Sequence, residues 1–264
     1  MKVALIHAPS VLDYKKNLTK IDAFIKKAMK TDKVEAIFLP EVFYSMSNGQ
    51  VPTPHLVSQN NVHYNNIKNL AKENGVYLIG GSVAFSKRGK IYNRALNFSP
   101  DGKSLGAYNK RKLFALNLKG RDKTNLDEGK IYSAGDKLKT LKLGNFKVGI
   151  SICFDLRFPE IYREYFKRKV DILTVASAFT VPTGKAHWKT LLRARAIENQ
   201  AYVIAANQWG KHNEKIKTYG HSMIIDPWGE ILAELPEGEG YICADLSTKR
   251  LNSVRERMKV DPIT

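Results

Sequence analysis

The feature that most constrains the fold is a short apolar run that ends on a cysteine and is followed closely by a helix-forming run. Residues 146–152 are mostly apolar, as in a buried strand, and Cys153 follows them directly. The helix-forming run spans 159–167. A thiol at such a strand-to-helix turn is expected to be exposed at the sheet edge, near helix-start N–H groups that lower its pKa from about 8.5. The alternative is a buried structural cysteine, because free cysteines are often found in cores.

Strand-like and helix-like runs alternate along the whole chain, which favours an α/β fold. The expected elements are strand 3–6, helix 18–29, strand 36–39, helix 62–71 ending near Gly75, strand 76–85 interrupted at Gly80-Gly81, hairpin 91–98 and 104–108, strand 146–152, helix 159–167, strand 171–176, helix 186–200, strand 202–207, a hairpin around 226–229, strand 241–243 and a short helix capped by Ser247. No repeat, linker or low-complexity segment interrupts them. We therefore expect residues 1–264 to form a single domain of mixed sheets covered by helices.

The composition is that of a globular protein in a reducing compartment. The 264 residues suffice for one large α/β domain, and 43% hydrophobic and 26% charged residues are ordinary values. Two cysteines, Cys153 and Cys243, provide no disulfide framework. The first apolar run is too short for a signal peptide, and none approaches the roughly 20 residues of a membrane span. We expect a cytoplasmic protein with no membrane partner.

The charge is unusual, with 43 basic and 25 acidic residues and a net charge of +18. Such an excess can indicate binding to nucleic acid or to an acidic surface. Here the lysines are scattered, and the densest cluster, 110–112, has no interleaved aromatic residues beyond Tyr108 and Phe114. We expect a solvated basic surface or attraction of anionic substrates, and no nucleic-acid partner; a polyanion partner is the alternative.

Three chemically useful side chains stand where predicted strands end. Glu41 follows the strand 36–39, Lys110 follows the strand that ends at Tyr108, and Cys153 ends its own strand. The carboxyl ends of strands in an α/β sheet converge on the ligand crevice, so these side chains can meet there. Residues 109–135 are irregular and basic, and we expect a long functional loop.

A carboxylate, an ammonium and a thiol together can cleave an amide. A thiol is only a few per cent thiolate at neutral pH, so a base such as Glu41 helps it to attack. The same carboxylate can then protonate the leaving amine and activate water. Lys110 can hold the negative oxygen of the adduct, and one such donor contributes about 10²–10³ in rate. Taken singly, Glu41 or Lys110 would be better explained as part of a surface salt bridge.

Several stretches resemble one known family, in its own order and over nearly the whole chain. They are 39–43, 108–114, 149–160, 178–180, Thr183-Gly184 and His187-Trp188. On these residues the chain is identified as similar to the nitrilase, or carbon–nitrogen hydrolase, superfamily, whose signature is a Glu–Lys–Cys triad. The resemblance implies a four-layer α-β-β-α sandwich, paired through its helices into dimers or larger homo-oligomers.

The resemblance also implies roles for particular residues. Glu41 would be the general base, Lys110 the oxyanion-holding lysine and Cys153 the nucleophile. Glu128 matches a second glutamate that many members carry before the cysteine strand, where it would orient Lys110 and the substrate amide; a solvated loop acid is the alternative. The backbone N–H of Phe154 would be a second oxyanion donor.

Two later stretches, 188–200 and 219–229, are similar to the deaminated glutathione amidase branch. The neighbouring omega-amidase branch shares the triad and acts on α-ketoglutaramate. Both substrates are anions bearing a keto acid and an amide, which suits a basic protein. Lys112 and Lys189 stand where many relatives have histidine and glutamate, so the substrate stays more open than the reaction.

The expected activity is that of a cofactor-free amidase that cleaves a small, anionic amide through a Cys thioester and releases ammonia. Phe179 and Thr180, just past a predicted strand, are candidates for lining the pocket. His187 and His221 lack ligand spacing, so no metal is expected, and Cys243 is expected to be a core thiol. Nitriles, N-carbamoyl amides and aliphatic amides are alternative substrates on the same scaffold. A non-catalytic basic protein that binds polyanions is the more distant alternative.

Overall fold

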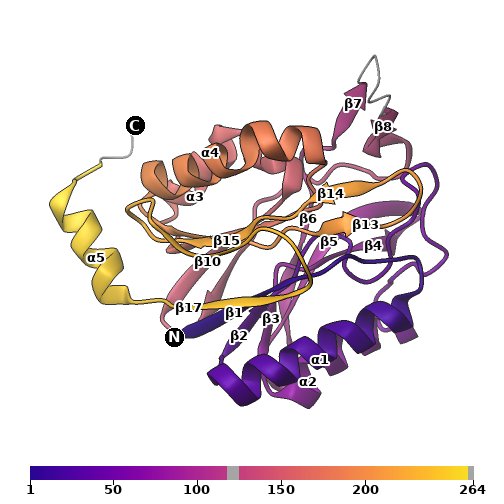
Figure 1. The fold of residues 1–264 in the computed structure, drawn as a ribbon, viewed down its shortest axis with the longest axis horizontal. Coiled ribbons are helices and arrows are strands. Elements are labelled where there is room, and N and C mark those ends of the chain that lie inside the picture. Colours follow the sequence, from indigo (N-terminus) through magenta and orange to yellow (C-terminus); the bar gives the residue numbers. More distant parts are fainter. Residues whose placement is uncertain (118–124, 261–264) are drawn as a thin grey trace.

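Two mixed β-sheets pack face to face and carry helices on both outer faces, as Figure 1 shows. The computed structural model describes residues 1–117 and 125–260. The seven-stranded sheet contains β1 (Lys2–His7), β2 (Ala36–Phe38), β3 (Tyr77–Ile79), β4 (Ser82–Lys87), β5 (Lys90–Phe98), β6 (Ser104–Asn109) and β17 (Gly240–Asp245). The six-stranded sheet contains β9 (Thr140–Leu143), β10 (Phe146–Ile152), β11 (Ile172–Ala176), β12 (Tyr202–Ala205), β15 (Ser222–Ile225) and β16 (Ile231–Leu235). The predicted four-layer α-β-β-α sandwich is confirmed.

Two helices cover each sheet (Figure 1). The seven-stranded sheet packs against α1 (Tyr14–Asp32) and α2 (Val62–Asn74), and the six-stranded sheet packs against α3 (Pro159–Lys167) and α4 (Val181–Asn199). The last helix is α5 (Thr248–Arg257), whose N-cap is Ser247 as predicted. The C-cap of α2 is Gly75 at φ 63°, a left-handed conformation that glycine adopts without steric cost.

Parallel strands occupy the centre of both sheets. The order is β17-β1-β2-β3-β5-β4 in one sheet, with β6 paired to β5, and β16-β15-β12-β11-β10-β9 in the other. The β1–β2–β3 and β10–β11–β12 pairs are parallel. In β1, Val3 and Leu5 enter the core between the sheets, whereas Ala4 and Ile6 pack toward α1 and α2. Strands buried on both faces are therefore continuous apolar runs in the sequence.

The structure corrects several predicted boundaries. The predicted strand 76–85 is two strands, β3 and β4, separated at Gly80-Gly81. The helix α4 begins at Val181, five residues before the predicted start. Within the predicted loop 109–135, β7 (Ala115–Asn117) and β8 (Asn125–Asp127) form an antiparallel pair, and 118–124 lies outside the described residues. A second short hairpin joins β13 (Trp209–Lys211) to β14 (Lys217–Tyr219). Cys243 is only half-buried at the edge of the core, so its prediction as a core thiol is wrong.

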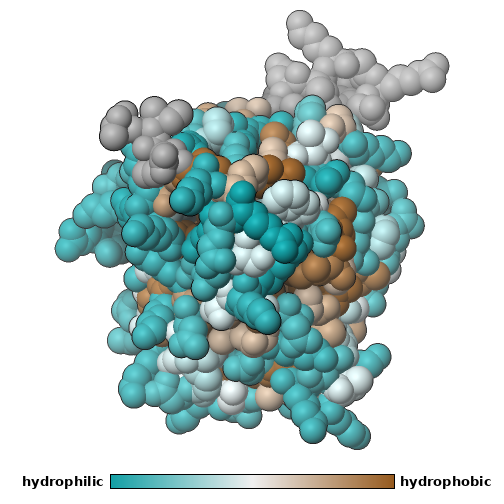
Figure 2. Space-filling model, turned by 90° about the vertical axis from the view of Figure 1, so that its left-hand side faces the viewer, coloured by the Kyte–Doolittle hydropathy of each residue, from teal (hydrophilic) through white to brown (hydrophobic). Residues whose placement is uncertain are grey.

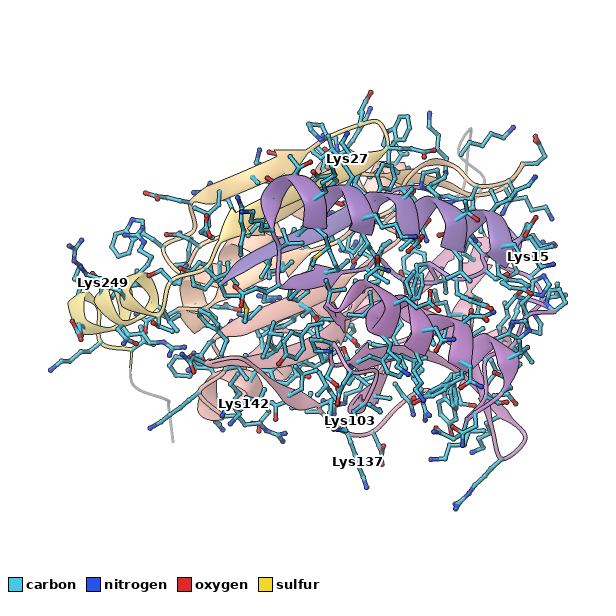
Figure 3. All side chains as sticks on the ribbon, turned by 90° about the horizontal axis from the view of Figure 1, so that it is seen from below. Lys15, Lys27, Lys103, Lys137, Lys142 and Lys249 are labelled. Carbon is cyan, nitrogen blue, oxygen red and sulfur yellow. The ribbon has the colours of Figure 1, made fainter. Side chains whose placement is uncertain are left out.

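The basic residues are widely separated on the surface. Figure 3 shows lysines projecting from α1, from the β5–β6 turn, from β9 and the segment before it, and from α5, at different sides of the molecule. The labelled examples, all exposed, are Lys15, Lys27, Lys103, Lys137, Lys142 and Lys249. Among the described residues, no helix is both long and apolar enough to cross a membrane.

Candidate active site

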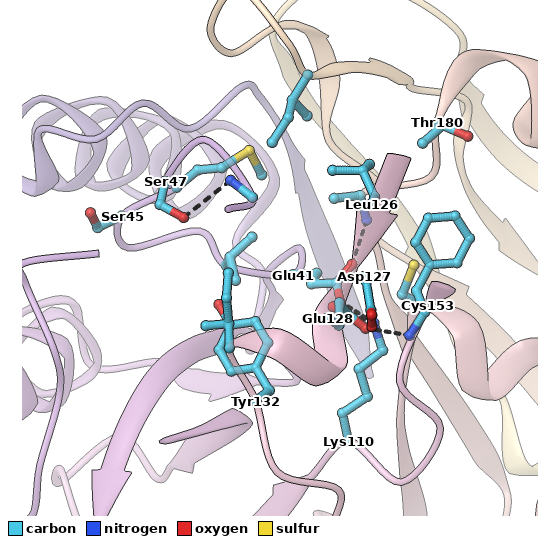
Figure 4. Close-up of a pocket in the computed structure, with 17 residues that line it drawn as sticks. Glu41, Ser45, Ser47, Lys110, Leu126, Asp127, Glu128, Tyr132, Cys153 and Thr180 are labelled. Atoms are coloured by element: carbon cyan, nitrogen blue, oxygen red, sulfur yellow. Dashed lines mark hydrogen bonds and ion pairs between the residues drawn. The ribbon is translucent and has the colours of Figure 1, made fainter. Parts of the chain in front are cut away.

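The ends of three strands meet at a cavity of about 110 Å³ (Figure 4). Glu41 follows β2, Lys110 follows β6 and Cys153 follows β10, and all three side chains line the cavity together with Glu128. Its remaining wall comes from the segment 42–49, from β8 and from the β13–β14 hairpin. Lys110 is the only basic side chain among the described residues of this wall. The arrangement brings together the four polar side chains that were singled out from the sequence.

Lys110 is buried between two carboxylates. Its Nζ lies 2.7 Å from Glu41 Oε1 and 2.7 Å from Glu128 Oε2, and its side chain is only 1% exposed. Burial by itself would lower the pKa of Lys110, but the charges of Glu128 and Glu41 outweigh it and raise the pKa well above its usual value. Burial also raises the pKa of Glu128, partly opposed by Lys110. Two carboxylates around one ammonium give the ionised cluster a net negative charge.

Glu41 is held by three donors that use both of its oxygens. Oε1 accepts hydrogen bonds from Lys110 Nζ at 2.7 Å and from Asn93 Nδ2 at 2.8 Å. Oε2 accepts from the backbone N–H of Ala178 at 2.9 Å. The Glu41 main-chain carbonyl accepts from Gln208 Nε2 at 2.6 Å. Asn93 and Ala178 were not predicted from the sequence, because neither lies near Glu41 along the chain.

Cys153 begins a 3₁₀ turn, Cys153–Arg157, directly after β10, and its backbone has φ 47°. A left-handed conformation at a non-glycine residue costs of the order of 1–3 kcal/mol and is typical of functional sites. Cys153 is buried, with 8% of the residue exposed, so the predicted exposure at a sheet edge is wrong. Burial, and then the negative charge of Glu41, raise the pKa of Cys153 well above its usual value. The predicted lowering by helix-start N–H groups is therefore also wrong.

Asp155 ties the turn that begins with Cys153 to the segment that carries Lys110. Its buried carboxylate accepts hydrogen bonds from Ile152 N at 3.0 Å, from the Tyr108 hydroxyl at 2.7 Å and from Lys112 N at 2.9 Å. These donors belong to β10, to β6 and to the segment after Lys110. Asp155 therefore sets the position of Cys153 relative to Lys110. The sequence contains one signal for it, an acidic residue two positions after the cysteine and between the apolar residues Phe154 and Leu156.

The remaining predicted residues surround Cys153 on two sides. Glu128 returns to the site through a hydrogen bond from Phe114 N to its Oε2 at 2.7 Å, so it is not a solvated loop acid. Thr180 lines the main cavity. Phe179 packs on Trp188, with ring centroids 4.7 Å apart, and lines a smaller hollow beside Cys153 together with Phe154. The role of the Phe154 N–H as an oxyanion donor stays a prediction.

Among the described residues, no group of three or more histidine, cysteine, aspartate or glutamate side chains is arranged to hold a metal ion. The groups that meet beside the Cys153 thiol at the cavity are the Glu41 and Glu128 carboxylates, the Lys110 ammonium and the Ala178 backbone N–H. This set can perform nucleophilic addition to a carbonyl with general base assistance.

Comparison with known proteins agrees with this chemistry. A family model described as carbon–nitrogen hydrolase matches residues 2–256. The deaminated glutathione amidase of Dictyostelium discoideum is 37% identical over 272 residues, covering 98% of this chain and 92% of the relative. The human omega-amidase NIT2 is 34% identical over 244 residues, covering 92% of this chain and 87% of the relative. The crystal structure of Saccharomyces cerevisiae Nit3, a member of branch 10 of the nitrilase superfamily, superposes with a TM-score of 0.88 at 32% identity, covering 98% of this chain and 94% of that one.

Proposed function

The chain belongs to the carbon–nitrogen hydrolase family, and we propose that it hydrolyses a small amide through a thioester formed on Cys153. It is a hydrolase of carbon–nitrogen bonds other than peptide bonds. The observation that supports the thioester mechanism is the buried cluster of Glu41, Lys110 and Glu128 around a thiol whose pKa is raised. A thiol in that state needs a base at the moment of attack.

In the first half of the reaction, Glu41 accepts the Cys153 proton as the sulfur adds to the amide carbonyl. The Lys110 ammonium stabilises the oxyanion of the tetrahedral adduct, with the Phe154 N–H as a second donor. The adduct collapses when the C–N bond breaks and Glu41 returns its proton to the leaving amine. A thioester on Cys153 and a free amine result.

In the second half, Glu41 takes a proton from water as the water oxygen adds to the thioester carbonyl. Lys110 again holds the oxyanion. The C–S bond then breaks, the sulfur recovers a proton through Glu41, and the carboxylic acid leaves. Glu128 keeps Lys110 in place through both halves, since it contacts Nζ with both oxygens at 2.9 and 2.7 Å.

For the substrate, we propose a small amide of a keto acid. The relatives named deaminated glutathione amidase and omega-amidase support it. Cleavage of deaminated glutathione or of α-ketoglutaramate would leave the same acyl group on the cysteine. The leaving amine differs: it is ammonia from the primary amide and the dipeptide cysteinylglycine from deaminated glutathione.

The test is product release from deaminated glutathione, α-ketoglutaramate, an aliphatic amide, a nitrile and an N-carbamoyl amino acid. Amine and acid products are both quantified, and Cys153→Ala is the blank. We expect the two keto acid amides to be preferred and Cys153→Ala to be inactive with its fold intact. Hydrolysis by Cys153→Ala near the wild-type rate would disprove the role of the thiol. Salt-dependent binding of nucleic acid by an otherwise inactive wild type would favour the non-catalytic alternative.

We further propose a cytoplasmic protein whose residues 1–264 form one domain and assemble as a homodimer or larger homo-oligomer. The free thiols of Cys153 and Cys243 support a reducing compartment. Large apolar side chains exposed on α4 and around the β15–β16 hairpin, Ile197 and Trp228, support an interface between copies. Figure 2 shows one face on which apolar patches interrupt the hydrophilic surface. Sedimentation velocity of the wild type distinguishes a dimer from a monomer.

A further inference from the structure

Asn93 hydrogen-bonds to both carboxylates of the site, Glu41 and Glu128, without itself lining the cavity. It lies on β5, is 1% exposed, and its Nδ2 lies 2.8 Å from Glu41 Oε1 and 3.4 Å from Glu128 Oε1. Its main-chain carbonyl accepts a hydrogen bond from Lys110 N at 2.8 Å. One residue therefore holds Glu41 and Glu128 through its side chain and Lys110 through its backbone.

The orientation of the Asn93 amide follows from the charges that face it. If the amide were flipped, Oδ1 would lie against Glu41 Oε1, and two acceptors cannot bond. With Nδ2 directed at the carboxylates, Oδ1 is buried and has no hydrogen-bond partner among the described residues. An unmade buried hydrogen bond is unfavourable. The fold keeps this unpaired oxygen beside the reacting groups. The hydrogen bonds that Nδ2 of Asn93 donates therefore matter more than a hydrogen bond to Oδ1.

The contact of Asn93 leaves Glu41 with two inequivalent oxygens. A carboxylate oxygen has about two acceptor sites. On Oε1 both are filled, one by Lys110 and one by Asn93, whereas on Oε2 the Ala178 N–H fills only one. The backbone N–H of Ala178 also acts to lower the pKa of the Cys153 thiol, so Oε2 and the thiol both lie near this N–H. Only Oε2 has an acceptor site left for the thiol proton.

We propose that Asn93 is a positioning residue that assigns Oε1 of Glu41 to structure and Oε2 to proton transfer, and that holds both carboxylates around Lys110. This inference rests on the proposed role of Glu41 as the base. The titratable groups that face the pair are Lys110, Cys153 and Tyr132. Asn93 does not itself line the cavity, so it acts through Glu41 and Glu128.

The test compares Asn93→Leu with the wild type by two pH profiles. The first is kcat/KM on the substrate found in the panel. The second is the rate of alkylation of Cys153 by iodoacetamide, read by mass spectrometry in a Cys243→Ser background, which needs no substrate. Removing a donor to an ionised carboxylate makes the carboxylate easier to protonate, so we expect the acid limb of both profiles to move up by about 1 pH unit. We expect kcat to fall roughly 10- to 100-fold with little change in KM.

The matched control is Asn97→Leu. Asn97 lies on the same strand, is equally buried, and bonds to Gly80 N and the Gly106 carbonyl, far from the carboxylates. It should lower thermal stability while leaving both acid limbs in place. If Asn93→Leu does not fold, Asn93→Ser is measured in the same way.

The outcomes separate this inference from the proposed function. If the Asn93 variant is folded and its acid limbs coincide with those of the wild type, the positioning role of Asn93 is overturned. This holds even when the wild type hydrolyses amides. A shifted alkylation limb together with a wild type that hydrolyses nothing would support the positioning role and reject the proposed function.

Discussion

The chemistry of this protein depends on how single buried charges are balanced. Cys153 lies beside carboxylates, and burial and these charges keep its pKa high, so the resting site holds a thiol. A site of this kind does not keep the cysteine ionised between reactions, since a permanent thiolate would react with many electrophiles. In the proposed mechanism the thiolate forms only when Glu41 takes the proton. Burying the Glu41 and Glu128 carboxylates and the Lys110 ammonium costs free energy. This cost is offset because Lys110 contacts both carboxylates at hydrogen-bond distance.

The second carboxylate gives a prediction about pH. The pKa of Glu128 is raised by burial, so on acidification Glu128 takes up a proton at a higher pH than a free glutamate would. A protonated Glu128 holds Lys110 less firmly, and activity should fall there. Glu128→Gln mimics the protonated state, and we expect kcat/KM to be lower by roughly 10- to 100-fold with the acid limb flattened.

The measurement is kcat/KM between pH 4 and 8 for wild type, Glu128→Gln and a control, Glu160→Gln, whose side chain is exposed on α3. The control should follow the wild type. A Glu128→Gln profile that matches the wild type in height and shape would show that Lys110 is positioned without Glu128.

Among the elements, the unit β10–turn–α3 fixes the position of Cys153. Gly149, in β10, faces the ring of Tyr165 in α3, and the Tyr165 hydroxyl reaches back to the Ile150 carbonyl. A Cβ at Gly149 would lie 2.9 Å from carbons of that ring. The close approach of strand and helix therefore requires a residue without a side chain. Because the ring is fully buried, it has no free space into which to move.

We predict that Gly149→Ala lowers the free energy of unfolding by about 1–3 kcal/mol through overpacking. Urea unfolding followed by fluorescence measures it. Gly240→Ala is the matched control in β17, since its Cβ would make an ordinary contact of 3.5 Å with Leu235. The control should lie within about 0.5 kcal/mol of the wild type. Equal midpoints for the two variants would contradict the packing argument.

Across the whole molecule, a buried histidine joins the two sheets. His7 of β1 bonds through Nδ1 to the Ser222 hydroxyl of β15 at 2.8 Å, and its ring stacks on Trp209. Burial, and then the neighbouring His221, lower the pKa of His7 to about 4. The neutral ring is therefore part of the interface between the layers.

This coupling predicts sensitivity to acid. Above pH 6.5, His7 is neutral in both folded and unfolded chains, so its full contribution is present. Between pH 6.5 and about 4, only the unfolded chain binds the proton, so stability falls as the pH falls, by about 3 kcal/mol in total. Urea midpoints from pH 7 to 4 measure the slope. His7→Gln should remove this part of it, and an unchanged slope in the variant would show that other groups cause the acid sensitivity.

Much of the fold could be predicted because its signals are local. Apolar periodicity located most of the strands and helices, including the hairpin 91–98 and 104–108, and Gly75 and Ser247 marked helix ends. The positions of Glu41, Lys110 and Cys153 at strand ends could be predicted from the sequence for the same reason. Each of these signals arises from residues within a few positions of one another, which is the range of helical and turn hydrogen bonds.

The properties of the site were decided by tertiary contacts. Glu41 meets Asn93, 52 positions away, and Ala178, 137 positions away, and the strands that bring them together have no local signature of their pairing. The thiol pKa was predicted in the wrong direction because burial depends on which distant segments cover the strand end. Charge and desolvation act through space, so they follow from the packing of the two sheets. The order of residues along the chain supplied the reacting groups, and the folded sandwich set their protonation and their partners.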